Sequence, residues 1–200
     1  MSTAPAIPFV GLTGGLGAGK SSALEALGRL GAVTLSTDAV VHDLYESPQV
    51  VDAVVARWGP QVAPEGVVDR AQVARHAFAD RQEREWLESL LWPLVGSEIQ
   101  EFRDRAAAAT PPPRAAVVET PLLFEAGMES AYDATIAIVA GEEQRRDRAR
   151  ARGHEAVDER ESRQLTQDEK AGRATYVVEN DGSLEDLEAA LAEVLEKLGR

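Results

Sequence analysis

The sequence predicts an α/β fold in which a parallel sheet is covered by helices on both faces. Short apolar runs of strand length alternate with segments of helical period along the 200-residue chain. A glycine-rich turn joins the first predicted strand to the first predicted helix. A long stretch of mainly helical pattern, residues 39–110, interrupts the alternation. Together these observations predict one α/β domain that carries a helical insertion.

The first strand is predicted at residues 9–13, a short apolar run that ends in the glycine-rich turn. A helix follows from Lys20, with leucines on one face and Gly31 as its stop. The second strand covers residues 32–35 and ends at Ser36-Thr37-Asp38. This strand–turn–helix–strand order is typical of a parallel sheet.

The helical stretch contains two breaks and ends in a stiff connector. Gly59-Pro60 and Pro64-Glu65-Gly66 interrupt the pattern, and Thr110-Pro111-Pro112-Pro113 closes it. Trp58, Trp86 and Trp92 are predicted to belong to the core of this insertion and not to a stacking platform. We therefore expect several helices with a small core of their own.

The rest of the chain returns to alternating strands and helices. Buried strands are predicted at residues 115–119, 135–139 and 176–179. A long charged helix is expected from Glu142 to about residue 174. The last helix presents leucines on one face, and Ser183 is its predicted N-cap, with Asp186 three residues later.

The composition restricts the class of partner. The formal net charge is −13, and a field of that sign argues against nucleic acid as the main partner. The chain has no cysteine, which excludes disulfides, thiolate nucleophiles and cysteine metal sites. Its start lacks the pattern of a secretory signal, and no apolar run approaches the roughly 20 residues that span a bilayer. We expect a soluble, cytoplasmic protein with no membrane partner, and its oligomeric state stays open.

The segment Gly14–Ser21 matches the phosphate-loop pattern G-x-x-x-x-G-K-[ST] in full, between a predicted strand and an amphipathic helix. Glycines allow positive φ, so that consecutive backbone N–H groups can surround a phosphate at the helix N-terminus. Lys20 would neutralise the β- and γ-phosphate oxygens, and the Ser21 hydroxyl would bind Mg²⁺. The alternative is a glycine-rich turn without a ligand. The complete pattern and its context favour a nucleoside triphosphate site.

Three classes of phosphate-loop protein compete: a small-molecule kinase, a GTPase switch and a non-catalytic nucleotide-binding module. A GTPase reads guanine with an N/T-K-x-D motif. The lysines of this chain are Lys20, Lys170 and Lys197, and none has Asp two residues later. This observation excludes the GTPase, and the short chain disfavours a large motor ATPase.

Arginines gather in one helical region of this acidic chain. They are Arg145, Arg146, Arg148, Arg150, Arg152, Arg160 and Arg163. Arg148 and Arg152 would project from one helix face, as a lid over bound triphosphate requires. The alternative is a solvated face of ion pairs with Glu142, Glu155 and Glu159. We expect ion pairs for most of these arginines and a lid function for one or two.

Asp38 is predicted at the carboxyl end of the second strand, the edge at which ligands of open α/β sheets gather. A carboxylate there could accept the proton of an acceptor hydroxyl. It could equally be the N-cap of the helix expected from Ala39. Position alone leaves both roles open.

Histidines show no metal-ligand spacing, so His42, His76 and His154 are interpreted as surface or helix residues.

Other segments match a known family in order and spacing. They are Gly11–Ser21, Leu30-Gly31-Ala32, Ser36-Thr37-Asp38, Asp69-Arg70, Glu119–Glu125, the series Arg148, Arg152, Arg160, Gln164 and Lys170, and Asn180-Asp181-Gly182. Over nearly its whole length the chain resembles dephospho-CoA kinase, the last enzyme of coenzyme A biosynthesis.

The resemblance implies a P-loop NTPase three-layer fold with a parallel sheet, a helical substrate-binding insertion and a lid. The core would comprise residues of about 7–38, 112–145 and 173–200 in a single domain. The insertion, at about 39–111, would bind the CoA part of the substrate, and the lid would cover about 146–172.

The resemblance also implies transfer of the γ-phosphate of ATP to the ribose 3′-hydroxyl of dephospho-CoA, with Mg²⁺. The ATP site would comprise Gly15, Gly17, Ala18, Gly19, Lys20, Ser21, Ser22 and Asn180, the last near adenine. The catalytic residues would be Asp38, Lys20, Arg148 and Arg152, and the acceptor site would include Asp38, Arg70, Trp92 and Leu122. Ser21 and Glu119 would hold Mg²⁺ and its water shell.

The chain departs from the family pattern at four places. The first Asp of D-A-D is Ser36, the His of His-Pro is Trp92, the Asp before the last strand is Thr175, and the Gln before the lid arginines falls on Arg145. None of these positions belongs to the phosphate loop, so we expect activity to survive. The alternative function is a P-loop kinase with another small acceptor, such as a nucleoside monophosphate.

Overall fold

The structure is a computed structural model that describes residues 7–151 and 164–199. Its contacts divide the chain into two compact units. Residues up to Ser36 and from Arg103 onward form the first, here called the core unit. Residues 37–102 form the second, here called the helical unit. Each unit is described by itself.

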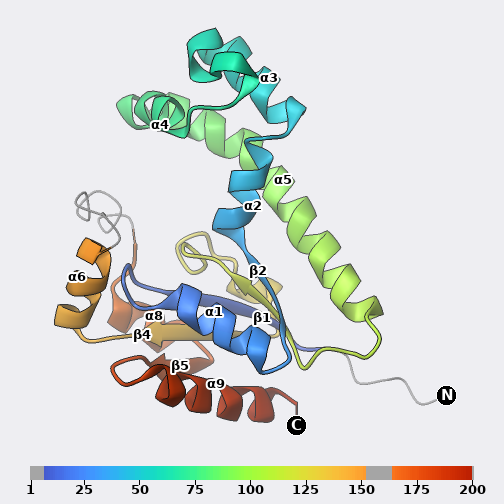
Figure 1. Ribbon diagram of the computed structural model, residues 1–200, viewed down its shortest axis with the longest axis vertical. Helices are drawn as coiled ribbons and strands as arrows, with labels where there is room; N and C mark the ends of the chain where they lie inside the picture. The colour runs from blue at the N-terminus through green and yellow to red at the C-terminus, as the bar shows by residue number, and fades with distance from the viewer. Residues whose placement is uncertain (1–6, 152–163, 200) are drawn as a thin grey trace. The chain divides into compact units, whose positions relative to one another are not determined.

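The core unit contains a five-stranded parallel sheet in the order β2-β3-β1-β4-β5 (Figure 1). The strands are β1 (Phe9–Gly14), β2 (Val33–Ser36), β3 (Ala116–Glu119), β4 (Ala134–Val139) and β5 (Tyr176–Glu179). Strands β2 and β3 lie on one side of the central strand β1, and the later strands β4 and β5 lie on its other side. Such a reversal places ligands at the carboxyl ends of the strands. The predicted parallel α/β fold is confirmed.

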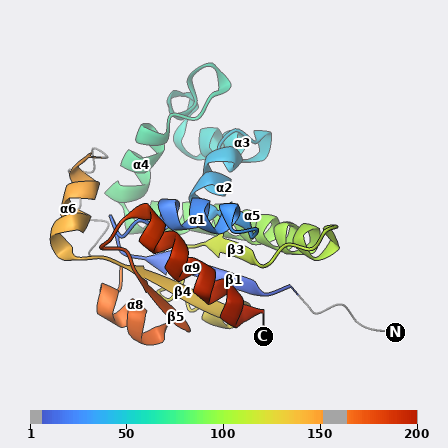
Figure 2. The same ribbon diagram turned by 60° about the horizontal axis from the view of Figure 1, so that its bottom comes forward.

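Helices cover both faces of this sheet because the side chains of β1 alternate between them. Val10 and Leu12 share a core cluster with Leu27 of α1 (Lys20–Arg29) and Leu191 of α9 (Leu184–Leu198). On the opposite face, the Thr13 hydroxyl donates to the carbonyl oxygen of Pro121 at 3.3 Å. Figure 2 shows α1 and α9 together on one face and α8 (Gln167–Arg173) on the other.

The helical unit contains α2 (Thr37–Leu44), α3 (Pro48–Trp58), α4 (Arg70–Ala79) and most of α5 (Arg81–Ala108). Two 3₁₀ turns, η1 (Pro60–Val62) and η2 (Pro64–Gly66), lie at the predicted breaks.

A separate hydrophobic cluster supports the helical unit. Val50, Val54 and Leu91 are buried in it together with Trp58. Trp58 also meets Trp86 edge to face, with ring centroids 5.0 Å apart. The prediction that these two tryptophans lie in the core of this region is confirmed.

The long helix predicted from residue 142 to about 174 is wrong as a continuous element. The structure has α6 (Glu142–Ala151) and α8, and residues 164–166 between them are not helical. The reason is local, because Thr166 begins a new helix. Its hydroxyl accepts from the Glu169 backbone N–H while the Glu169 carboxylate accepts from the Thr166 backbone N–H.

The predicted cap of the last helix is confirmed by the same kind of capping box. The Ser183 hydroxyl accepts from the Asp186 backbone N–H, and the Asp186 carboxylate accepts from the Ser183 backbone N–H. The Asp186 carboxylate accepts hydrogen bonds from both the backbone N–H and the hydroxyl of Ser183, and these hold the pKa of Asp186 below its usual value. A short 3₁₀ turn, η3 (Glu129–Ala131), precedes β4. Within the described ranges, no helix combines the length and the apolar character needed to cross a membrane.

Candidate active site

The phosphate loop connects the end of β1 to the start of α1, and most of its residues are buried. Gly15, Gly17, Ala18 and Gly19 are buried, and Leu16 is half-buried. Gly17 and Gly19 have φ of +74° and +96°, values that favour glycine. A Cβ atom on Gly19 would lie 2.1 Å from the amide nitrogen of Asn180. The glycines of the motif are therefore required by backbone conformation and by close packing.

Lys20 is held against the loop that it follows. Its Nζ donates to the carbonyl oxygens of Gly14, at 3.1 Å, and Gly15, at 3.2 Å. Ser21 is exposed and Ser22 is half-buried in the first turn of α1. That turn contains no acidic residue, so the partial positive charge of the helix N-terminus is not neutralised there. A cation, hydroxyls and a helix N-terminus thus meet where a phosphate group could bind.

Asn180, directly after β5, connects the phosphate loop to the rest of the sheet edge. It is 6% exposed, and its Nδ2 donates to the carbonyl oxygen of Ala18 at 2.8 Å. Its backbone N–H donates to the carbonyl oxygen of Val139 at the end of β4, also at 2.8 Å. The neighbouring Asp181 accepts from the Gly141 backbone N–H at 2.6 Å. Asn180 therefore stabilises the phosphate loop through the Ala18 carbonyl oxygen. Its expected place near adenine stays a prediction.

Two arginines of α6 face the phosphate loop. Nε of Arg145 donates to the carbonyl oxygen of Leu16 at 2.9 Å. Both terminal nitrogens of Arg148 donate to the carbonyl oxygen of Asn180 at 3.1 Å. A Cβ atom on Gly19 would lie 3.7 Å from Arg148 Nη1, so this guanidinium is adjacent to the loop. Two permanent positive charges thus border the loop.

Of the other arginines in this region, one forms an ion pair and several lie outside the described residues. Arg146 forms an ion pair with Glu142 one helical turn away, as expected for a solvated helix face. Arg152, Arg160 and Arg163 lie outside the described residues.

Glu119 is the last residue of β3 and is nearly buried, with 6% of its surface exposed. Its Oε2 accepts a hydrogen bond from the Ser36 hydroxyl at 2.8 Å. Strand register pairs Glu119 with Leu12 on one side, two residues before the phosphate loop begins. The carboxylate therefore lies at the carboxyl edge of the sheet.

The turn after β3 is attached to α8 by a buried ion pair. Lys170 is fully buried, and its Nζ lies 3.0 Å from Glu125 Oε1 and donates to the Pro121 carbonyl oxygen at 2.6 Å. Burial lowers the pKa of Lys170, and the hydrogen bond and charge of Glu125 partly oppose that effect. Leu122, in the same turn, is 43% exposed. The segment that carries Leu122 is thus fixed at both ends, whereas the Leu122 side chain is open to a ligand.

The predicted acceptor residues Asp38, Arg70 and Trp92 lie in the helical unit. Asp38 is exposed in the first turn of α2, which begins at Thr37, so Asp38 is inside the helix and not its N-cap. Trp92 in α5 is 64% exposed, in contrast to Trp58 and Trp86, so the prediction that it belongs to the core is wrong. Arg70 is exposed at the start of α4.

His42, interpreted from the sequence as a surface or helix residue, lies in α2 and contacts the predicted acceptor residue Arg70. Its Nδ1 lies 2.9 Å from Arg70 Nη1, and because arginine only donates, Nδ1 is the acceptor and the ring proton is on Nε2. Tyr45 is close enough for the Arg70 charge to oppose the burial that raises its pKa. The spacing of Asp38, His42 and Tyr45, four and then three residues, could have indicated one helix face.

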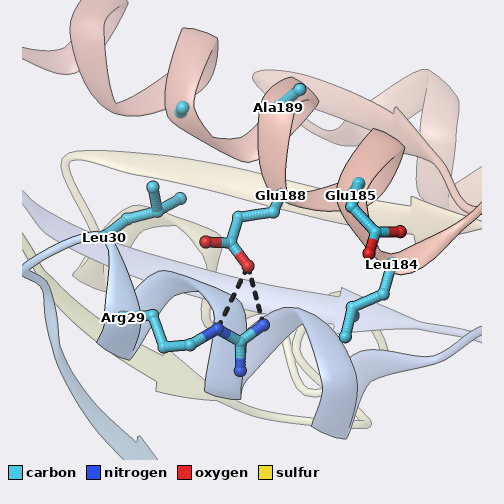
Figure 3. Close-up of a pocket in the computed structure, with 7 residues that line it drawn as sticks. Arg29, Leu30, Leu184, Glu185, Glu188 and Ala189 are labelled. Atoms are coloured by element: carbon cyan, nitrogen blue, oxygen red, sulfur yellow. Dashed lines mark hydrogen bonds and ion pairs between the residues drawn. The ribbon is translucent and has the colours of Figure 1, made fainter.

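A surface hollow between α1 and α9 does not belong to this site. Arg29, Leu30, Leu184 and Glu188 are among its lining residues (Figure 3). The Arg29 guanidinium donates twice to one carboxylate oxygen of Glu188, at 3.0 and 2.8 Å. The hollow includes the last turn of α1, whereas the phosphate loop precedes its first turn. Because Arg29, the cation among these lining residues, is paired with Glu188, the hollow offers no unpaired positive charge to a phosphate group.

Comparisons with known proteins agree with this geometry. A family model described as dephospho-CoA kinase matches residues 8–186. A dephospho-CoA kinase of Rhodopseudomonas palustris is 35% identical over 194 residues, which are 96% of this chain and 96% of the relative.

Two solved structures are similar over nearly the full chain. The Thermus thermophilus protein TT1252 has a TM-score of 0.80 and 36% identity, and the match covers 96% of this chain and 98% of that one. A dephospho-CoA kinase from Campylobacter jejuni has a TM-score of 0.69 and 22% identity, over 95% and 96% of the two chains. The second likeness supports the fold.

Proposed function

Because the chain belongs to the dephospho-CoA kinase family, we propose that it transfers the γ-phosphate of ATP to the ribose 3′-hydroxyl of dephospho-CoA. The products are coenzyme A and ADP, and the reaction is the last step of coenzyme A biosynthesis. The observation that carries this proposal is the family match across residues 8–186, which includes the complete phosphate loop. A cytoplasmic location and the absence of nucleic-acid and membrane partners belong to the same proposal.

The core unit supplies the ATP site. Backbone N–H groups of Gly15 to Gly19 surround the phosphates, and Lys20 leaves its carbonyl partners for the β- and γ-phosphate oxygens. Arg148 and Arg152 neutralise charge that develops during transfer. Asn180 holds the loop in shape through the Ala18 carbonyl oxygen. These residues position and neutralise the triphosphate, which is most of what phosphoryl transfer requires.

The donor set near the loop fits Mg²⁺. This ion takes hard oxygen ligands and keeps several waters, so that one hydroxyl, one carboxylate and the phosphates suffice. Ser21 is exposed at the start of α1, and Glu119 has a carboxylate oxygen without a hydrogen bond among the described residues. Ser21 would hold the ion directly, and Glu119 would hold its water shell. The bound ion would neutralise charge on the β- and γ-phosphates.

The helical unit supplies the acceptor residues. Asp38 orients the ribose hydroxyl and accepts its proton, which leaves late because the transition state is loose. Arg70 binds an anionic group of the acceptor. Its hydrogen bond to neutral His42 orients the guanidinium without neutralising it, and no carboxylate forms an ion pair with Arg70 among the described residues. Trp92 offers exposed apolar surface to the substrate, and Leu122, a residue of the core unit, is also predicted to contact it.

Product analysis tests the proposal. The protein is incubated with ATP, Mg²⁺ and dephospho-CoA, and the product is identified by mass spectrometry and by its 3′-phosphate. Lys20→Ala is expected to lower turnover by about 10²–10³, the usual cost of removing a preorganised charge. Asp38→Asn is expected to lower kcat, by at most about 10²–10⁴, with ATP affinity unchanged.

The two variants separate a kinase from a nucleotide binder. If Asp38→Asn turns over normally, the catalytic assignment of Asp38 fails. If neither wild type nor variants form coenzyme A although ATP binds, the proposed function fails.

A further inference from the structure

Ser36 and Glu119 form a pair at the carboxyl edge of the sheet. They are the last residues of β2 and β3, and strand register places them side by side. The Ser36 hydroxyl donates to Glu119 Oε2 at 2.8 Å. Ser36 is also one of the positions at which the sequence departs from the family pattern that it resembles.

The hydrogen bond matters because Glu119 has little contact with solvent. With 6% of its surface exposed, the carboxylate must obtain hydrogen bonds from the protein or from bound groups. Among the described residues, Ser36 is the side chain that donates to it, and Oε1 has no protein donor. Oε2 is thus fixed by Ser36, and Oε1 can accept a hydrogen bond from a water molecule that a ligand holds.

We propose that Ser36 is a positioning residue that fixes the Glu119 carboxylate through Oε2, so that Oε1 is presented to the water shell of nucleotide-bound Mg²⁺. This inference rests on the proposed function, in which Glu119 holds that shell. A hydroxyl suits the position, because it donates to the carboxylate without adding a charge beside it. The role is indirect, since Ser36 acts through Glu119.

Calorimetry of ADP binding, with Mg²⁺ and with EDTA, tests the role without turnover. Ser36→Ala is expected to lower ADP affinity about fivefold with Mg²⁺, the ordinary strength of one hydrogen bond, and to leave affinity in EDTA unchanged. Ser36→Thr keeps the hydroxyl and is expected to retain the affinity.

A matched control comes from the same strand. Thr34 lies two residues before Ser36, on the same strand face, and no hydrogen bond of its hydroxyl is found among the described residues. Thr34→Val should therefore bind ADP as wild type does in both conditions. If Ser36→Ala does not fold, Ser36→Cys replaces it, because a thiol has similar shape and is a weak donor.

Glu119→Gln and the double variant distinguish the two levels of the proposal. Glu119→Gln is expected to lose at least as much Mg²⁺-dependent affinity, and adding Ser36→Ala should cost nothing more. If Ser36→Ala matches Thr34→Val while Glu119→Gln is impaired, the role of Ser36 is refuted and that of Glu119 stands. Full additivity of the two changes also refutes it. If Glu119→Gln binds as wild type, the proposed role of Glu119 itself fails.

Discussion

The side-chain amide of Asn180 donates to the backbone carbonyl of Ala18 at 2.8 Å, joining residues 162 positions apart in the chain. This contact attaches the phosphate loop to the segment after the last strand. Arg148 binds the carbonyl oxygen of the same asparagine. Asn180 thus links the loop to one of the arginines proposed to act on the triphosphate.

Removing this link should weaken ATP binding. Asn180→Ala leaves the buried Ala18 carbonyl oxygen without its donor, which costs about 1–3 kcal/mol and predicts an ATP Kd raised about tenfold. Asn180→Asp should be worse, since it presents a carboxylate to that carbonyl and adds negative charge near the phosphates. Isothermal calorimetry measures both. Wild-type affinity in both variants would show that the asparagine does not support the loop.

Gly19 can be tested against a second glycine of the same region. Gly19→Ala combines φ of +96° with a Cβ atom 2.1 Å from Asn180 Nδ2, so we expect loss of measurable ATP binding. Gly28→Ala, inside α1, meets no atom within 4 Å and should stabilise the helix by about 1 kcal/mol. Calorimetry and thermal unfolding give both results. A Gly19→Ala protein that binds ATP normally would contradict the described loop geometry.

Arg70 and His42 are predicted to affect the acceptor and not ATP. Arg70→Ala should raise the KM for dephospho-CoA by about tenfold or more, as expected when a charged hydrogen bond of about 1.5–3 kcal/mol is lost. His42→Ala should have a smaller effect of the same kind, because it only orients the guanidinium. Arg75→Ala, an exposed arginine of the same helix, is the control. Equal KM values in all three variants would remove Arg70 from the acceptor site.

The buried ion pair of Lys170 and Glu125 is predicted to stabilise the folded protein. Lys170→Ala leaves Glu125 without its cation and should cost about 3 kcal/mol or more, which lowers Tm by about 6 °C or more. Lys197→Ala, on the exposed end of α9, should cost less than about 1 kcal/mol. Thermal unfolding measures both. Equal Tm values would mean that the ion pair does not anchor α8.

Local patterns predicted much of this molecule. The apolar runs and the glycine-rich turn indicated each strand of the sheet, and the serine–aspartate spacing indicated the cap of the last helix. The sequence analysis predicts one continuous helix here, although Thr166 and Glu169 carry a local capping signal for a new helix, α8. The charged residues on both sides of it also have a helical pattern, which obscures this signal.

Other features depend on the fold and have no local signal. The contact of Asn180 with Ala18 requires knowledge of which strands are neighbours in the sheet. The burial of Lys170 could not be read from its type, because lysine is almost never fully buried. The pairing of Ser36 with Glu119 follows from strand register, which the sequence does not state.

The central claim is the identity of the acceptor, and a coupled ADP-release assay over a panel of acceptors tests it most directly. The panel contains dephospho-CoA, AMP and UMP at saturating ATP and Mg²⁺, with an ATP-only sample as background and Lys20→Ala as the inactive control. The account predicts turnover with dephospho-CoA far above background, and kcat/KM values for AMP and UMP lower by orders of magnitude. Background rates with dephospho-CoA, together with clear turnover of AMP or UMP, would contradict it.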